Sequence, residues 1–370
     1  MKPKIVDLFS GVGGFSLGAA RAGFDVSLSV EIDPHAIAAH KKNFPLVRHI
    51  DADISLINGN HILDSIGVNV GQLDGLVGGP PCQGFSMIGK REVHDTRNDL
   101  FVKFFELVSE IKPKFFVAEN VTGIMNDQYS NIRDQAFEFV NRDYIFLVPM
   151  KLDASDYGAP TIRKRFFFIG YRNDAINDLS PDLFYSEKIE TKNLVGPALI
   201  GLPENILDEW ITESQSWREV DDLPSSHFYD RVIGNIPEGI GDPDTIDIYK
   251  NKRIVSGCFG TRHSKEVRER FRRLKAGERD KISKSIRLDV NGLCPTIRAG
   301  TNKDKGSYQA VRPIHPTIPR VISPREAARL QGFPDWFRFA PTKWHSFRQI
   351  GNSVSPLLAE IIFKVIVERL

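Results

Sequence analysis

The stretch KIVDLFSGVGGFSLG, residues 4–18, holds in order a strand, a glycine-rich turn and the start of a helix. Its first six residues, Lys4–Phe9, are mostly apolar, which predicts a buried strand. The glycines of the turn let the backbone approach a ligand closely at a helix N-terminus, and we expect that helix to reach about Ala22. Turns of this kind occur in nucleotide-binding folds of many functions. The stretch therefore predicts an α/β fold with a ligand site, without specifying the activity.

The second expected strand supplies the next part of this site. Val26–Val30 is followed by Glu31, and an acidic residue roughly 20 positions after the glycine turn is placed to bind ribose hydroxyls. Asp53 and Ile54 follow a third expected strand and could hold the edge of an adenine. These features indicate an adenosyl ligand, but they do not separate NAD from S-adenosylmethionine.

A cysteine stands in an unusual setting in the stretch GGPPCQGFS, residues 78–86. Two prolines precede Cys82 and restrict the backbone that carries it. The apolar run Leu73–Val77 predicts a short strand that ends before this turn, which puts Cys82 on the rim where open α/β sheets bind ligands. A lone cysteine is more often a small buried hydrophobe, but a core residue needs no special backbone on both sides. We therefore interpret Cys82 as a nucleophile.

An acidic residue follows another apolar strand. Phe115–Ala118 predicts a buried strand, with Glu119 and Asn120 at its end. A thiolate normally needs a base or a positive field, and no His neighbours Cys82 in sequence. A cysteine that adds to an electron-poor ring carbon needs a proton donor for the ring nitrogen, which a carboxyl group in a dry site can supply. The alternative interpretation of Glu119 and Asn120 is a helix cap or a turn after the strand.

The sequence resembles the C5-cytosine DNA methyltransferase family along nearly the whole chain. Six motifs follow the family's order, at residues 7–15, 80–83, 119–121, 163–165, 325–334 and 349–354. Two positions depart from the family pattern. Thr161 stands where the family usually has Gln, and Ser355 where it commonly has Pro. The first departure bears on how the arginines of the motif at 163–165 are braced.

The resemblance implies a mechanism. Cys82 would attack C6 of a cytosine while Glu119 stabilises the ring through N3. Arg165 would contact the carbonyl oxygen of the base, and Arg163 nearby backbone or phosphate. The family flips its target base out of the duplex, because the ring carbon cannot be attacked inside the stack.

The resemblance also implies S-adenosylmethionine as the cofactor, with no metal. The residues expected to contact the cofactor are Phe9, Ser10, Gly11, Gly13, Gly14, Phe15, Glu31, Ile32, Asp53, Ile54, Gly79, Pro81, Leu100, Asn352, Ser353 and Val354. The loop from Gln83 to about Asp99 is interpreted as a mobile cover over the flipped base, or alternatively as a solvated surface loop. Its expected DNA contacts are Gln83, Ser86, Lys90 and Arg91.

Composition places the chain among globular proteins. It has 370 residues, 41% hydrophobic and 26% charged, so we expect two domains. We find no apolar run of membrane-spanning length and no signal peptide, and three scattered cysteines indicate a reducing compartment without structural zinc. We expect a cytoplasmic monomer.

Basic residues are concentrated although the net charge is only +2. Residues 264–287 hold ten Lys or Arg and four acidic residues, a local net charge of +6. Val267, Phe271 and Leu274 predict a helix that packs on one face. A basic helix is often only a solvated face. Here we predict double-stranded DNA as the partner, with phosphate contacts from Arg268, Arg272 and Arg273 and further DNA contacts from Arg298, Lys303, Lys305 and Arg312.

These patterns predict an α/β fold with a doubly wound, mostly parallel sheet and a smaller irregular target-recognition domain. We place the catalytic and cofactor-binding domain at residues 1–172, the recognition domain at 173–322 and the returning catalytic part at 323–370. Trp210 and Trp217 are expected to anchor the core of the recognition domain. The third part is predicted to begin with a helix capped by Ser323 and to end with an amphipathic helix, roughly Pro356 to Glu368.

Three alternative functions stay open. A tRNA cytosine methyltransferase shares the catalytic motifs but has a short recognition region, and Cys258-Phe259 faintly resembles that branch. A nicotinamide oxidoreductase would explain the glycine turn and Glu31, but leaves Cys82 and Glu119 unexplained. A non-catalytic DNA-binding relative would not need both of those residues. Over these three we favour a sequence-specific DNA methyltransferase of restriction-modification type, and a functional pairing with a restriction endonuclease stays open.

Overall fold

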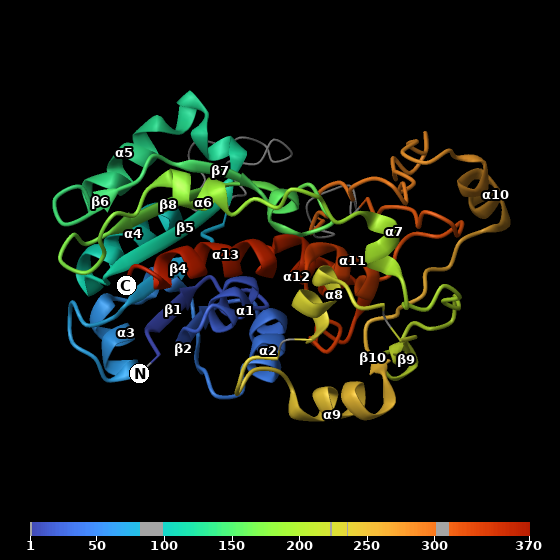
Figure 1. The fold of residues 1–370 in the computed structure, drawn as a ribbon, viewed down its shortest axis with the longest axis horizontal. Helices are drawn as coiled ribbons and strands as arrows, with labels where there is room; N and C mark the ends of the chain where they lie inside the picture. Colours follow the sequence, from blue (N-terminus) through green and yellow to red (C-terminus); the bar gives the residue numbers. More distant parts are fainter. Residues whose placement is uncertain (1, 82–98, 223, 235, 301–310) are drawn as a thin grey trace.

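The structure, a computed structural model, describes residues 2–81, 99–222, 224–234, 236–300 and 311–370, and it is built around one twisted sheet (Figure 1). The sheet order is β3-β2-β1-β4-β5-β8-β6, and β7 pairs with β8. The strands are β1 Lys4–Leu8, β2 Asp25–Glu31, β3 Arg48–Asp51, β4 Gly75–Gly78, β5 Phe115–Val121, β6 Ile145–Phe146, β7 Met150–Asp153 and β8 Lys164–Tyr171.

The strand directions confirm the predicted doubly wound, mostly parallel sheet. From β3 to β5 every neighbouring pair is parallel, whereas β8 runs antiparallel to β5, β6 and β7. The order of the strands reverses between β1 and β4, which lie side by side at the centre. Open α/β sheets bind their ligands at such a switch point, so the fold places the glycine turn after β1 where a ligand is expected.

Helices cover both faces of the sheet (Figure 1). Side chains alternate along β1, so that Ile5 packs with α1 and α13 while Val6 and Leu8 pack with α3, α4 and α5. One layer consists of α1 Gly14–Arg21, α2 Pro34–Asn43 and α13 Pro356–Val367. The other consists of α3 Gly59–Ile66, α4 Asp99–Ile111 and α5 Ser130–Glu138.

The C-terminal helices return to the N-terminal part of the sheet, as the sequence predicts. A side chain at Gly14 would lie 2.2 Å from Oγ of Ser353 and 2.3 Å from the carbonyl oxygen of Val354, so only glycine allows this approach. The expectation of an amphipathic last helix is wrong, because α13 is buried on nearly every side and only Lys364 is exposed.

The apolar character of the C-terminal end reflects this burial. Together α12 and α13 form a stretch, Lys343–Val367, that is long and apolar enough to cross a membrane, although we expected no such run. In its most apolar window 83% of the residues are buried inside the molecule. Packing against α1 and the sheet therefore accounts for these apolar side chains.

The middle of the chain is irregular. Its elements are α6 Pro181–Ser186, α7 Val195–Leu199, β9 Arg218–Glu219, α8 His227–Tyr229, the π-helical turn η7 Asp230–Gly234, α9 Pro243–Lys252, β10 Ile254–Val255 and α10 Lys265–Arg273. The guanidinium of Arg218 lies 3.3 Å from the ring centroid of Trp210, and that of Arg338 lies 4.9 Å from Trp217. Each tryptophan is thus covered by an arginine that lies outside the apolar core. The domain boundaries at residues 172 and 322 stay predictions.

The third part of the chain begins as predicted. Ser323 caps α11, Pro324–Gln331, and forms a capping box with Glu326, with proline at the first helical position. This helix carries Arg325 and Arg329 into the interior, where Arg329 pairs with Asp335. Next comes α12, Lys343–Asn352.

Candidate active site

The rim of the sheet brings the predicted acid to the segment that leads into Cys82, which itself lies outside the described residues. Oε2 of Glu119 would lie 3.3 Å from a side chain placed at Gly79, and Nδ2 of Asn120 donates a hydrogen bond of 3.4 Å to the carbonyl oxygen of Pro80. Glu119 and Asn120 stand near the end of β5, which runs to Val121, as predicted, so the alternative interpretation of a cap or turn after the strand is wrong. Strand pairing with β8 fixes them more firmly than a turn would.

Glu119 and Arg165 form an ion pair across β5 and β8. Nε of Arg165 lies 2.8 Å from Oε1 of Glu119, with side chains only 15% and 10% exposed. Nη1 of Arg165 also donates to the carbonyl oxygen of Lys164 at 2.9 Å. Because arginine carries five N–H donors, this guanidinium keeps donors for a substrate oxygen beyond these two contacts.

Arg163 lies deeper than the sequence suggests. Its side chain is buried, and its backbone N–H donates to Oδ1 of Asp153 at 2.9 Å. Arg163 is thus less accessible to the predicted DNA phosphate than Arg165 is to the predicted base.

The two cysteines that the structure describes are poor nucleophiles. Cys258 and Cys294 are both buried, and burial raises the pKa of each thiol to about 12. Since the thiolate is the reactive form, neither can replace Cys82. Among the described residues no group of three or more His, Cys, Asp or Glu is placed to hold a metal ion.

Glu31 ties the second strand to the glycine turn. Its Oε2 accepts from the N–H of Gly11 at 2.8 Å, and its Oε1 accepts from those of Ile32 and Asp33 at 2.8 Å each. Burial raises the pKa of Glu31, and these backbone donors oppose the rise. Ser10 lies in the same turn and shares a hydrogen bond with Ser29, 2.7 Å between the hydroxyl oxygens.

The outer side of this turn is open to a ligand. Gly11 has a φ of +56°, and a side chain placed there would meet no atom within 4 Å. Ile32 beside it is 61% exposed. A cavity of about 500 Å³ joins Asp53 and Leu100, two further predicted cofactor residues, and its other lining residues are Ser55, Asp99, Val102, Lys103, Glu106 and Gln135. Phe9 and Ile54 belong to the apolar cluster beneath Leu100.

Other predicted cofactor residues shape the turn from within. Phe15 is buried against Phe167 and Phe363, and a side chain at Gly13 would collide with the ring of Phe44. Gly14, Ser353 and Val354 pack on one another, while Asn352 is exposed at the end of α12. The structure thus brings this set together, although several members contact protein rather than an open site.

A buried polar chain beneath the turn has no counterpart in the sequence predictions. The hydroxyl of Ser16 donates to Oδ2 of Asp7 at 2.6 Å and lies 3.1 Å from Nε2 of His40, whose Nδ1 lies 2.9 Å from Nε2 of His49. Since Ser16 donates to Asp7, His40 must donate to Ser16 and accept from His49. Burial raises the pKa of Asp7 to about 7 and lowers that of His40. In the sequence, this chain of hydrogen bonds is indicated only by Asp7, a polar residue within the apolar run of β1.

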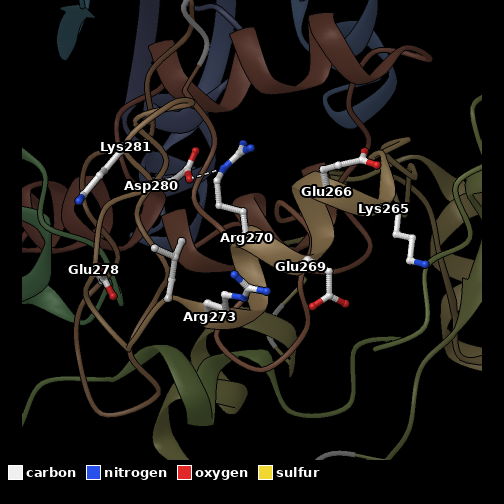
Figure 2. A pocket seen from close by; sticks show the side chains of 9 residues that line it. Lys265, Glu266, Glu269, Arg270, Arg273, Glu278, Asp280 and Lys281 are labelled. Atoms are coloured by element: carbon white, nitrogen blue, oxygen red, sulfur yellow. Dashed lines mark hydrogen bonds and ion pairs between the residues drawn. The ribbon is translucent and has the colours of Figure 1, made fainter.

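The cavity beside the basic helix α10 is lined by as many acidic as basic residues. Arg268 pairs with Asp208 and Arg272 with Glu269, whereas Arg273 has no such partner among the described residues. A cavity of about 690 Å³ lies beside α10, and Nε of Arg270 lies 2.6 Å from Oδ1 of Asp280. Figure 2 shows Arg270 pointing toward Asp280 there. Its lining residues are Lys265, Glu266, Glu269, Arg270, Arg273, Leu274, Glu278, Asp280 and Lys281. This side of α10 is therefore mixed in charge.

The predicted DNA contacts after α10 divide into two kinds. Arg298 is exposed, whereas Arg312 is buried, donates to the carbonyl oxygens of Arg298 and Ala299, and lies 4.0 Å from the ring centroid of Phe347. The structure gives Arg312 a bracing position rather than a DNA-facing one. Lys303, Lys305, Gln83, Ser86, Lys90 and Arg91 lie outside the described residues.

Comparison with known proteins identifies the class to which this rim belongs. The family model for C-5 cytosine-specific DNA methylases matches residues 3–368. The chain therefore belongs to the C-5 cytosine-specific DNA methylase family and is an enzyme of that kind, which removes the nicotinamide oxidoreductase from the alternatives.

Individual relatives agree with this assignment. The chain is 39% identical to the Type II methyltransferase M.XorII of Xanthomonas oryzae pv. oryzae, over 98% of this chain and 84% of that protein. It is 33% identical to the Type II methyltransferase M.DdeI of Desulfomicrobium norvegicum, over 97% and 87%. A solved structure of a putative DNA modification methyltransferase encoded within an E. coli prophage shares 52% identity, with a TM-score of 0.90 over 100% of this chain and 99% of that one.

A more distant solved structure shares the fold alone. The Dnmt2 methyltransferase of S. pombe is 14% identical, with a TM-score of 0.65 and 99% of each chain covered.

Proposed function

We propose that this enzyme is a Type II modification methyltransferase that transfers a methyl group from S-adenosylmethionine to C5 of a cytosine within a specific site of double-stranded DNA. The observation that carries the proposal is the Glu119–Arg165 pair, 2.8 Å apart and nearly buried, beside the Gly79-Pro80 backbone that leads to Cys82. Relatives named as Type II methyltransferases, matched along almost the whole chain, support the same function.

In the proposed reaction the thiolate of Cys82 forms a bond to C6 of the cytosine. Glu119, whose carboxylate is paired with Arg165, takes up a proton from water and delivers it to N3, so that the electron pair of the C5–C6 double bond becomes available at C5. That pair would form the new bond to the methyl group, whose bond to the donor sulfur breaks, and the N3 proton would return to Glu119. Loss of the C5 proton to water then restores the double bond, expels the thiolate of Cys82 and leaves the neutral methylated base.

Arg165 contributes positive charge where electron density builds up on the ring. A donor fixed before the reaction stabilises such charge without reorganisation at the transition state. Its pairing with Glu119 places both groups at one spot, which a base bound edge-on could contact through N3 and the neighbouring carbonyl oxygen. The target base must leave the stack to reach this rim, and we propose that the enzyme flips it out.

S-adenosylmethionine would supply the methyl group on a positively charged sulfur. The residues present fit it: the turn at Gly11 has open space above it, Glu31 stands at the end of β2, and Asp53 lines a neighbouring cavity. Glu31 is suited to ribose hydroxyls, and Asp53 to the adenine amino group. A partner endonuclease, a cytoplasmic location and a monomeric state stay predictions.

The decisive experiment traps the proposed adduct. The target site is first read by sequencing methylated DNA from an expressing host. A duplex carrying 5-fluorocytosine at that position is then incubated with enzyme and S-adenosylmethionine. Fluorine cannot leave C5 as the proton does, so the enzyme should remain covalently bound to the duplex, and a peptide containing Cys82 should carry the base by mass spectrometry.

Two controls sharpen this experiment. Cys82→Ser should give no adduct and no methyl transfer while still binding duplex and cofactor, because a hydroxyl is a far weaker nucleophile at neutral pH. An adduct on Cys258 or Cys294, or transfer of labelled methyl groups to tRNA in preference to DNA, would contradict the proposal.

A further inference from the structure

Two segments far apart in sequence are joined directly before the catalytic arginines. The N–H of Cys294 donates to the carbonyl oxygen of Pro160 at 2.9 Å, and the N–H of Ile162 donates to the carbonyl oxygen of Cys294 at 2.8 Å. Thr161 Oγ1 donates to that same Cys294 oxygen at 3.1 Å. Thr161 and Cys294 are both fully buried. The region expected to read DNA is thus attached to the start of β8.

A second threonine completes this attachment from the other segment. Oγ1 of Thr296 donates to the carbonyl oxygen of Ile162 at 2.6 Å. The same peptide group donates its N–H, that of Arg163, to Oδ1 of Asp153 at 2.9 Å, and the Arg163 carbonyl oxygen accepts from Ala154 at 3.0 Å. The backbone on both sides of Arg163 is therefore held by hydrogen bonds, which fixes the direction in which β8 begins.

The segment containing residues 294–299 is also anchored at its far end. A side chain at Gly351 would lie 2.4 Å from the backbone nitrogen of Ala299, so α12 and this segment are in backbone contact. Arg312 holds the carbonyl oxygens of Arg298 and Ala299 and packs on Phe347 of the same helix. Between its two anchored ends the segment exposes the side chain of Arg298.

We propose that the hydroxyls of Thr161 and Thr296 form a clasp that positions Arg163 and Arg165, so that the segment 294–299 and the Arg165–Glu119 pair are held in one fixed relative geometry before a duplex binds. This inference rests on the proposed role of Arg165. It also gives a physical role to Thr161, because its short hydroxyl reaches the main chain of the second segment. The two threonines join the same two segments, Thr161 through the carbonyl oxygen of Cys294 and Thr296 through that of Ile162, and are positioning residues.

The test compares valine and serine at both positions. Thr161→Val and Thr296→Val keep the side-chain shape and remove one hydrogen bond each, so single-turnover methyl transfer should fall by about fivefold, the effect of one such bond. Equilibrium affinities for duplex and S-adenosylmethionine should stay within about twofold, since the clasp touches neither. Serine at each position should restore the rate. Because both bonds join the same two segments, the double valine variant should lose less than the product of the single losses.

Control variants separate a failed clasp from a failed catalytic assignment. Thr212→Val removes an exposed hydroxyl bonded to Gln215 and should leave the rate and the melting temperature unchanged. A lower single-turnover rate in Arg165→Ala, with wild-type rates in both valine variants, would overturn the clasp and leave the proposed function intact. Wild-type activity of Arg165→Ala would instead overturn the proposed function. Valine variants that lose duplex affinity at an unchanged rate would show that the two hydroxyls support DNA binding rather than the reaction, and would also overturn the clasp.

Discussion

The arginines of β8 and those of α10 are held in opposite ways. Arg165 is 15% exposed and pairs with Glu119, which is 10% exposed, whereas Arg268 and Arg272 are 45% and 59% exposed. Breaking a buried pair is costly because it leaves an uncompensated charge. An exposed pair contributes little and exchanges partners readily. The β8 arginine is thus fixed before any substrate arrives, while α10 arginines can exchange an acidic partner for a phosphate.

This difference separates chemistry from affinity in the molecule. The rim at β4, β5 and β8 is held by strand pairing and backbone hydrogen bonds, whose geometry changes little on binding. The helix α10 lies at one end of the molecule, away from the sheet (Figure 1). Changes at the rim should therefore affect rate, and changes on α10 should affect binding.

The largest effect is expected for Arg165→Ala. Removing a fixed donor to developing charge should lower single-turnover methyl transfer by roughly 10²–10³-fold. Duplex affinity should change little, because the side chain is nearly buried beside Glu119. Arg165→Lys keeps the charge but loses the planar fork and should recover only part of the rate. If the variant lost mainly duplex affinity, Arg165 would act in DNA binding as the α10 arginines do. The two regions would then not differ in function.

Arg298→Ala is expected to act on sequence discrimination. If its exposed side chain reads a base edge, the loss should be about 1–3 kcal/mol on the cognate duplex. The variant should bind a scrambled duplex of the same length as tightly as the wild type does. Equal losses on both duplexes, measured by titration at fixed salt, would mean that Arg298 contacts phosphate.

The α10 arginines should differ among themselves. Arg273→Ala should weaken binding to all duplexes alike. It should also lower the slope of log affinity against log salt by roughly 0.9. Arg268→Ala and Arg272→Ala should change the slope less, because Asp208 and Glu269 already compete for those guanidinium groups. Identical slopes for the three variants would show that the acidic partners are lost on binding. A loss of affinity for the cognate duplex alone would show that α10 contacts base edges.

Asp7→Asn tests the buried chain beneath the cofactor turn through stability. Burial raises the pKa of Asp7 from 3.8 to about 7 in the folded state. The folded protein then binds the proton more tightly than the unfolded chain, so the contribution of Asp7 to stability falls as pH rises from about 4 to about 7. Asparagine can still accept from Ser16. The melting temperature of the variant relative to wild type should therefore be higher at pH 8 than at pH 5, by a few degrees. A difference independent of pH would show that Asp7 ionises normally.

The sequence predicted the rim far better than the surface. The doubly wound, mostly parallel sheet follows from the alternating strand and helix patterns, and the return of Ser353 to Gly14 follows from the family resemblance. The pairing of Arg268 with Asp208 joins residues 60 positions apart, and no local pattern shows it. The burial of Arg312 against Phe347 likewise depends on tertiary packing. Thr161 could be recognised as unusual, but its acceptor, the Cys294 carbonyl, belongs to a segment placed only by the fold.

The most direct test of the central claim is single-turnover methyl transfer by Glu119→Gln. Glutamine can still donate a hydrogen bond but cannot pass a proton, so the rate should fall by roughly 10²-fold or more. Affinities for cognate duplex and S-adenosylmethionine should match the wild type. A wild-type single-turnover rate, with or without weaker cofactor binding, would contradict the assignment of Glu119 to proton transfer beside Cys82.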